Sequence, residues 1–232
     1  MKKTFGRSTL RSELLAAAAS GSAPRLGALL ASGAAPMPDD SRALSAAARH
    51  GHLSCLELLI PFRDPASWDF EALTLSAAAG HAECVKLLIP VCDPMANDSR
   101  ALCFAAENGR AECVRLLIPA SNPKAHGSNA LCRAARNGHA ECAKLLIPAS
   151  GPLHGSTSLH AALSAGQAEI VSAMFFHEPA ILHAAWLPKL LSEATLAGHC
   201  DLSAMLAALI DQRAISDSLP QAPCSVPSPT RL

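Results

Sequence analysis

The chain has 232 residues, of which 50% are apolar and only 3% aromatic, and its formal net charge is zero. This length and apolar fraction allow a substantial core. Because aromatic residues are scarce, that core must be built from Ala, Leu, Ile and Cys. A neutral chain gives no global sign of binding to nucleic acid or to an anionic membrane, and no stretch approaches the roughly 20 apolar residues of a spanning helix.

The N-terminal region is basic, with Lys2, Lys3 and Arg7, and an apolar run of Leu and Ala follows at 14–19. This order is typical of a secretory signal peptide, but Glu13 interrupts the junction and the run is short. The same residues also fit the repeat described next. We therefore expect residues 1–11 to be a flexible N-terminus and the folded part to begin at residue 12.

A sequence motif recurs every 29 residues along the middle of the chain, as the spacing of Gly51, Gly80, Gly109 and Gly138 shows. An Ala-rich segment precedes each glycine, and Ala-Glu-Cys-x-x-Leu-Leu-Ile-Pro follows it at 82–90, 111–119 and 140–148, with a looser copy at 53–61. Degenerate copies are centred on Gly21, Gly166 and Gly198. Degenerate ends are expected in a stack of repeats, because a terminal repeat exposes one face to water.

Each unit predicts two short helices. The first ends at the turn glycine, which can adopt the positive φ of a helix C-terminus. The second carries a wide apolar stripe and stops at a proline, as at Pro90. Neither helix is long enough to be stable alone, so the units must bury their apolar faces against one another. We expect this stack to span residues 12–210.

The repeat resembles the ankyrin family pattern T-P-L-H-x-A-A-x-x-G-H-x-x-x-V-x-x-L-L-L, and the copy at 157–162 keeps the most of its opening. The central copies open with Ala-Leu-Cys at 101–103 and 130–132, so the Thr–His hydrogen bond of the family is absent there. The resemblance implies an all-α, ankyrin-type helix-turn-helix solenoid of six to seven repeats.

The connecting loop departs most from the family. The family period is about 33 residues, so the missing residues fall in the β-hairpin "finger" between units. Each loop also carries two prolines at fixed spacing, as at Pro90 and Pro94, which removes two backbone donors. We therefore predict short, Pro-rich finger loops that form turns and not paired strands.

The cysteines and histidines of the repeat indicate structure and not chemistry. Cys55, Cys84, Cys113 and Cys142 occupy one repeat position, and stacked helices about 8–10 Å apart hold them too far from one another for a disulfide or a zinc site. The histidines that follow the turn glycines are interpreted as structural residues of the turn. The sequence contains no phosphate loop, nucleophile elbow or metal motif, so we predict no enzyme activity and no cofactor.

In the ankyrin family, variable residues near the turn glycine and at the start of the first helix commonly bind partners. Arginines recur at these positions and predict a basic stripe for an acidic partner, whereas Glu71 and Glu107 favour a solvated mixed face. Trp68 and Phe70 are either an exposed anchor or core packing beneath their loop. Carried over by register, the candidate protein-binding residues are Arg49, His50, Trp68, Phe70, Glu71, Arg100, Phe104, Glu107, Asn108, Asn129, Arg133, Arg136 and Asn137.

The resemblance implies a monomeric, non-enzymatic scaffold that binds a protein partner on its concave face, with no nucleic-acid or membrane partner. The reduced thiols suit the cytoplasm of the producing cell, and the Ala-rich copies look like arrays of bacterial effectors secreted into a host cell. One alternative is a regulatory or targeting subunit of an enzyme complex, with a metal site in 176–190 formed by His177, Glu178 and His183. Another is a structural spacer. Residues 211–232, rich in Pro and Ser, are expected to be disordered.

Overall fold

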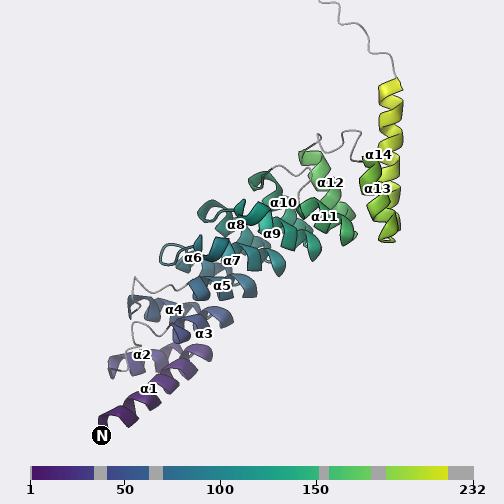
Figure 1. The fold of residues 1–232 in the computed structure, drawn as a ribbon. Coiled ribbons are helices and arrows are strands. Elements are labelled where there is room, and N and C mark those ends of the chain that lie inside the picture. Colours follow the sequence, from purple (N-terminus) through teal and green to yellow (C-terminus); the bar gives the residue numbers. More distant parts are fainter. Residues whose placement is uncertain (1, 34–40, 63–69, 152–156, 179–186, 219–232) are drawn as a thin grey trace, which may run out of the picture.

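The computed structural model describes residues 2–33, 41–62, 70–151, 157–178 and 187–218, which form helices and turns and no β-strand (Figure 1). The helices are α1 (Lys2–Ala19), α2 (Ala23–Ala31), α3 (Arg42–His50), α4 (Leu53–Leu59), η1 (Ile60–Phe62), α5 (Phe70–Ala79), α6 (Ala82–Leu88), α7 (Ala96–Glu107), α8 (Ala111–Leu117), η2 (Ile118–Ala120), α9 (Ala125–Arg136), α10 (Ala140–Leu146), η3 (Ile147–Ala149), α11 (Thr157–Ser164), α12 (Ala168–His177), α13 (Leu187–Leu196) and α14 (Cys200–Ser218).

The α-helices form seven antiparallel pairs stacked in one direction, which confirms the all-α solenoid (Figure 1). The odd-numbered helices α1 to α13 form one row, here called the first-helix row, and the even-numbered helices form the second-helix row. The helices α1 and α14 also cover residues outside the expected limits of 12 and 210. The Pro- and Ser-rich segment 219–232 lies outside the described residues.

The finger loops that the structure describes, 89–95 and 118–124, contain turns and a 3-10 helix, as predicted from their prolines. Pro61, Pro119 and Pro148 are each the second residue of a 3-10 helix that continues from the second helix of its repeat. A proline at this position ends the regular helix because it has no N–H for the α-helical hydrogen bond.

One continuous core runs through the stack from Leu14 to Leu206. Its largest fully buried side chains are mostly leucines, such as Leu73, Leu102 and Leu131, and alanines fill the space between neighbouring first helices. Alanine lets helices approach closely, so the first-helix row packs tightly without aromatic side chains. Phe175 is the one ring buried in the described core.

The first turn of α7 has an unusual backbone. Asn97, Asp98 and Ser99 have φ values of 49°, 58° and 59°, a left-handed conformation that costs roughly 1–2 kcal/mol per residue outside glycine. Ser99 is buried, and its hydroxyl accepts a hydrogen bond of 2.8 Å from the backbone N–H of Asn122 in the next loop. This contact ties the first turn of α7 to the next finger loop and helps to hold the strained turn.

A second contact joins successive repeats at the turn glycine. Nε2 of His52 donates to the carbonyl of Ala19 at 3.1 Å, and its ring covers Gly21 so closely that an added Cβ would lie 2.5 Å from Nδ1. The same bond recurs one repeat later from His81 to the carbonyl of Arg49. Equivalent bonds are donated by Arg110, His139 and His199. The turn histidines are therefore structural, and their partner lies in the preceding repeat.

One junction lacks this bond. Gln167 stands where the other repeats have His or Arg, and its side-chain amide donates to Ala165 of its own repeat at 3.3 Å. The backbone of Gln167, with φ −85° and ψ 74°, closely matches that of His139, with φ −84° and ψ 78°. In the other repeats the acceptor is the carbonyl two residues before the preceding turn glycine. A histidine introduced at position 167 would therefore donate to the carbonyl of Arg136.

Substitution of Gly21 and Gly198 by alanine separates the two roles of the turn glycine. Both have positive φ, but an added Cβ at Gly198 meets no atom within 4 Å. We expect Gly198→Ala to lower the free energy of unfolding by about 1 kcal/mol through backbone strain alone. Gly21→Ala should cost roughly 1–3 kcal/mol more, because the ring of His52 must move. Urea denaturation followed by circular dichroism measures both, and equal losses would contradict the steric role of the ring.

Replacement of Gln167 by histidine should stabilise the junction between α9 and α11. A new hydrogen bond to the carbonyl of Arg136 is expected to raise the free energy of unfolding by about 1 kcal/mol. The reverse change, His139→Gln, removes such a bond one repeat earlier and should lower it by a similar amount. Urea midpoints of the two variants provide the test, and a Gln167→His protein no more stable than the parent would contradict it.

Candidate functional site

The predicted binding residues occupy exposed or half-buried positions on the first-helix row wherever the structure describes them. Arg49 and His50 end α3, while Phe70 and Glu71 begin α5. The ring of His50 stacks on the ring of His52, with centroids 5.9 Å apart. His50 therefore lies beside a residue that joins two repeats. Trp68 lies outside the described residues, and Phe70 is half-buried.

Six of the predicted residues meet on α7 and α9. The ring of Phe104 lies between two guanidinium groups, with Cζ of Arg100 5.3 Å and Cζ of Arg133 5.5 Å from its centroid. The face of an aromatic ring carries partial negative charge and attracts both cations. This group, here called the Phe104 cluster, consists of Arg100, Phe104, Glu107, Asn129, Arg133 and Asn137.

Polar contacts hold Arg133 in place. Its guanidinium pairs with the carboxylate of Glu107, and its Nε donates to Oδ1 of Asn129 at 3.3 Å. The amide of Asn137 donates to the carbonyl of Glu107 at 3.2 Å. Arg133 is thus oriented over the ring before any partner arrives. Asn108 instead donates to the carbonyl of Phe104 within its own repeat, at 2.8 Å.

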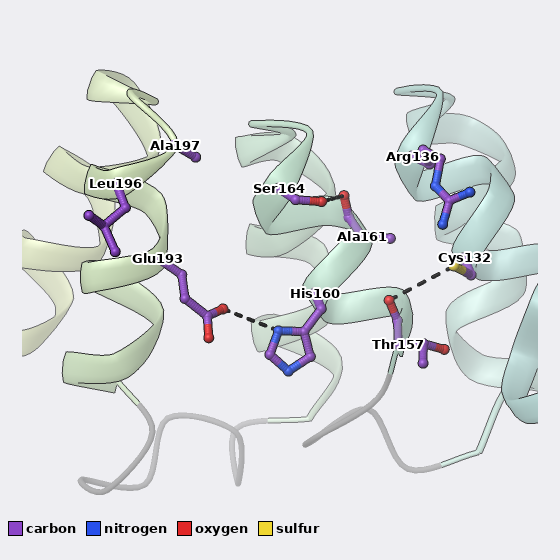
Figure 2. Close-up of a pocket in the computed structure, with 9 residues that line it drawn as sticks. All are labelled: Cys132, Arg136, Thr157, His160, Ala161, Ser164, Glu193, Leu196 and Ala197. Atoms are coloured by element: carbon purple, nitrogen blue, oxygen red, sulfur yellow. Dashed lines mark hydrogen bonds and ion pairs between the residues drawn. The ribbon is translucent and has the colours of Figure 1, made fainter.

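A groove of about 660 Å³ continues the first-helix row beyond this cluster, between α9, α11 and α13 (Figure 2). Arg136, a predicted residue, lies on the α9 side, and Leu196 lies on the α13 side. At one end His160 bridges to α13, with Nδ1 3.1 Å from Oε2 of Glu193. The groove combines a cation, an apolar wall and a carboxylate already in contact with a histidine.

His160, Glu193 and Leu196 line this groove but are not among the binding residues predicted from the sequence. Glu193 could have been predicted from its position in the repeat, because it lies five residues before its turn glycine, as Phe104 and Arg133 do. The spacing between turn glycines changes to 28 and then 32 residues here, because the glycines are at 138, 166 and 198. That irregularity hides which residues of α11 and α13 face one another.

The match to known proteins decides the family. The model of the family described as "Ankyrin repeats (3 copies)" matches residues 14–98, 44–126, 73–154 and 102–184, which together cover most of the chain. This chain belongs to the ankyrin repeat family. Ankyrin repeats generally mediate protein–protein interaction.

Solved ankyrin structures share the fold. The human ASB11 ankyrin repeat domain matches with a TM-score of 0.63 and 22% identity, over 72% of this chain and 84% of that one. An ankyrin repeat domain from Acinetobacter baumannii AYE matches with a TM-score of 0.58 and 23% identity, over 71% of this chain and 96% of that one. Identities this low establish the fold alone. A search of curated proteins finds no significant match.

The ankyrin opening is altered in this chain, as the sequence predicts. Where the family has its Thr–His pair, Cys103 contacts the carbonyl of Asp98 and Cys132 contacts that of Thr157, with sulfur–oxygen distances of 4.0 and 3.9 Å. His160, which keeps the family residue, contacts Glu193 of the next repeat. The two central first helices therefore begin with weak sulfur contacts in place of the side-chain bond of the family.

The repeated cysteines of this ankyrin stack are buried and unpaired, which confirms that they act as small apolar side chains. Burial disfavours the thiolate and raises the pKa of Cys113 and Cys142 to about 11. It raises the pKa of Cys55 and Cys84 in the same direction. These thiols remain protonated, and therefore weakly nucleophilic, at neutral pH.

The alternative metal site at 176–190 rests partly on residues that the structure does not describe. His183 lies in the undescribed segment 179–186, whereas His177 is the last residue of α12 and Glu178 follows it. Across the described ranges, no group of three or more His, Cys, Asp or Glu side chains is placed to hold a metal ion. Nor does any described helix combine the length and apolar character needed to cross a membrane.

Thiol alkylation tests the burial of the repeated cysteines. At pH 8 a thiol with a pKa of about 11 is ionised in only about one molecule per thousand, so native Cys113 and Cys142 should resist iodoacetamide. Cys200 is exposed and should react. Peptide mass spectrometry measures the modified fraction at each site, with urea-unfolded protein as the control in which all should react. Modification of native Cys113 as fast as Cys200 would contradict the assignment.

Proposed function

We propose that this ankyrin chain is a non-enzymatic scaffold that binds a protein partner on the concave face formed by its first helices. The observation that supports this most strongly is the Phe104 cluster, in which an aromatic ring is framed by two guanidinium groups on neighbouring first helices. The chain is only 3% aromatic, so a half-buried ring on this face stands out.

The residue types of the Phe104 cluster, and the contacts that hold its side chains in place, suit a binding hot spot. Arginine and aromatic side chains dominate the binding energy of protein interfaces, because they combine large contact area with directional polar groups. Arg133 is held by Glu107 and Asn129, so little side-chain entropy is lost when a partner binds against it. Arg100 has no anionic partner among the described residues and can pair with a carboxylate of the partner.

Affinity capture tests this function. The full chain, immobilised through a terminal tag, is expected to retain a partner that the Arg100→Ala, Phe104→Ala, Arg133→Ala variant loses. Removal of a hot spot costs about 2 kcal/mol or more, which is at least tenfold in affinity. The control is Arg115→Ala on α8, an exposed arginine of the second-helix row that pairs with Glu112 at 3.3 Å.

The outcomes separate the candidate functions. Equal capture by the triple variant and the parent would overturn the Phe104 cluster as the binding site. In that case a Trp68→Ala, Phe70→Ala variant tests the loop before α5 as the anchor instead. A regulatory or targeting subunit predicts that the retained partner is an enzyme, whereas a structural spacer predicts that no specific partner is retained.

The proposal extends to a bacterial effector that acts in a host cell, because the Ala-rich repeats look like those of secreted bacterial effectors. A fusion of residues 1–40 to a reporter enzyme, expressed in a bacterium with a type III secretion system, should be exported. A strain without the secretion apparatus is the control. Retention of the reporter in both strains would contradict the export hypothesis and leave the scaffold function unaffected.

A further inference from the structure

The groove beyond the Phe104 cluster exists because one repeat has small side chains at positions where its neighbours have large ones. Counted back from the turn glycine, the fifth and second residues are Phe104 and Glu107 on α7, and Arg133 and Arg136 on α9. On α11 the same positions hold Ala161 and Ser164. Because these side chains are small, α11 forms the bottom of the groove of about 660 Å³ that lies between α9 and α13 (Figure 2).

The two walls of this groove differ in chemistry. Arg136 on α9 is exposed, and no carboxylate among the described residues pairs with it, unlike Arg133 beside it. On the other wall, Leu196 of α13 is 88% exposed, which is unusual for a leucine at the edge of a packed stack. The carboxylate of Glu193 is in contact with His160 and closes one end of the groove.

We propose that this groove binds a short, extended peptide segment of a partner protein, in which a carboxylate pairs with Arg136 and an apolar side chain packs on Leu196. This inference rests on the proposed scaffold function and names the chemistry of the partner. An acidic group fits the α9 wall because a guanidinium without a partner forms charge-assisted, bidentate hydrogen bonds with carboxylates. The negative charge of Glu193 disfavours a second acidic residue near the α13 wall.

The spacing of the walls limits the peptide. Two helix-to-helix steps separate α9 from α13, roughly 20 Å in all, and the arginine side chain shortens the remaining distance. An extended chain advances about 3.3 Å per residue, so the acidic and apolar residues should be about four to six positions apart. The small side chains of Ala161 and Ser164 leave room for the peptide backbone between them.

Peptide selection on charge-reversed protein tests this directly. A phage-displayed library of random dodecapeptides is panned on the full chain and on the Arg136→Glu variant. The parent should enrich peptides with Asp or Glu four to six positions from Leu, Ile, Met or Phe, and Arg136→Glu should enrich Lys or Arg in place of the acid. The matched control is Arg115→Glu on α8, because Arg115 is an exposed arginine of the second-helix row outside the groove and its reversal is expected to leave the selected sequences unchanged.

Binding of the selected peptides gives the magnitude. In fluorescence anisotropy with a labelled peptide, Arg136→Ala should raise the Kd at least about tenfold, and added salt should weaken parent binding far more than it weakens binding to the alanine variant. Leu196→Ser should also raise the Kd but leave the salt dependence intact. Circular dichroism and urea midpoints show whether each variant keeps the fold of the parent.

The possible failures are distinguishable from failure of the scaffold function. The groove is overturned if panning yields no consensus, or if the parent consensus persists on Arg136→Glu and binds Leu196→Ser equally well. A consensus that is lost only in the Arg100→Ala, Phe104→Ala, Arg133→Ala variant also overturns the groove, while it supports binding elsewhere on the first-helix face. Failure of the scaffold function itself shows in the capture experiment, which does not depend on these peptides.

Discussion

The contact between a turn glycine and the residue that follows the turn glycine of the next repeat is the constraint on which this stack depends. Gly21 has positive φ, as the turn requires, and its missing Cβ makes room for the ring of His52. The ring then donates to a carbonyl at the end of the preceding first helix. The turn glycine thus allows the turn within its own repeat and sets the distance to the next repeat. Repeats that contact only their neighbours depend on such junctions for their stability.

Because the buried positions and the junctions hold the stack together, the residues on the exposed face of the first helices are free to vary. The buried positions hold Ala, Leu and Cys in every central copy, and the junction holds the glycine and its partner. The side chains of the fifth and second residues before the glycine are not used in the junction, to which the second residue contributes only its backbone carbonyl. They are Phe104 and Glu107 in one repeat, Arg133 and Arg136 in the next, and Ala161 and Ser164 after that. The cluster and the groove are therefore products of variation at two register positions on an otherwise constant scaffold.

The sequence predicts those parts of the molecule that depend on local signals. Turn glycines, stopping prolines and the apolar stripe place the helix pairs, and two prolines per loop predict turns where the family has strands. The contact between His160 and Glu193 was not predictable in this way, because it joins residues 33 positions apart across an irregular spacing. The left-handed turn at 97–99 contains no glycine, so composition gave no sign of it. The partner of each turn histidine likewise emerges only when repeats are stacked.

The short finger loops explain why binding is expected on helices and not on loop tips. The strained first turn of α7 is tied to the next finger loop through Ser99 and Asn122, so these connections contribute to stacking. The junction between α9 and α11 is the one where Gln167 makes no bond to the preceding repeat, and the groove lies over this junction. A peptide that bridges α9 and α13 would add contacts across that junction. Because a ligand stabilises the state that it binds, occupation of the groove would tighten the stack where its own contacts are fewest.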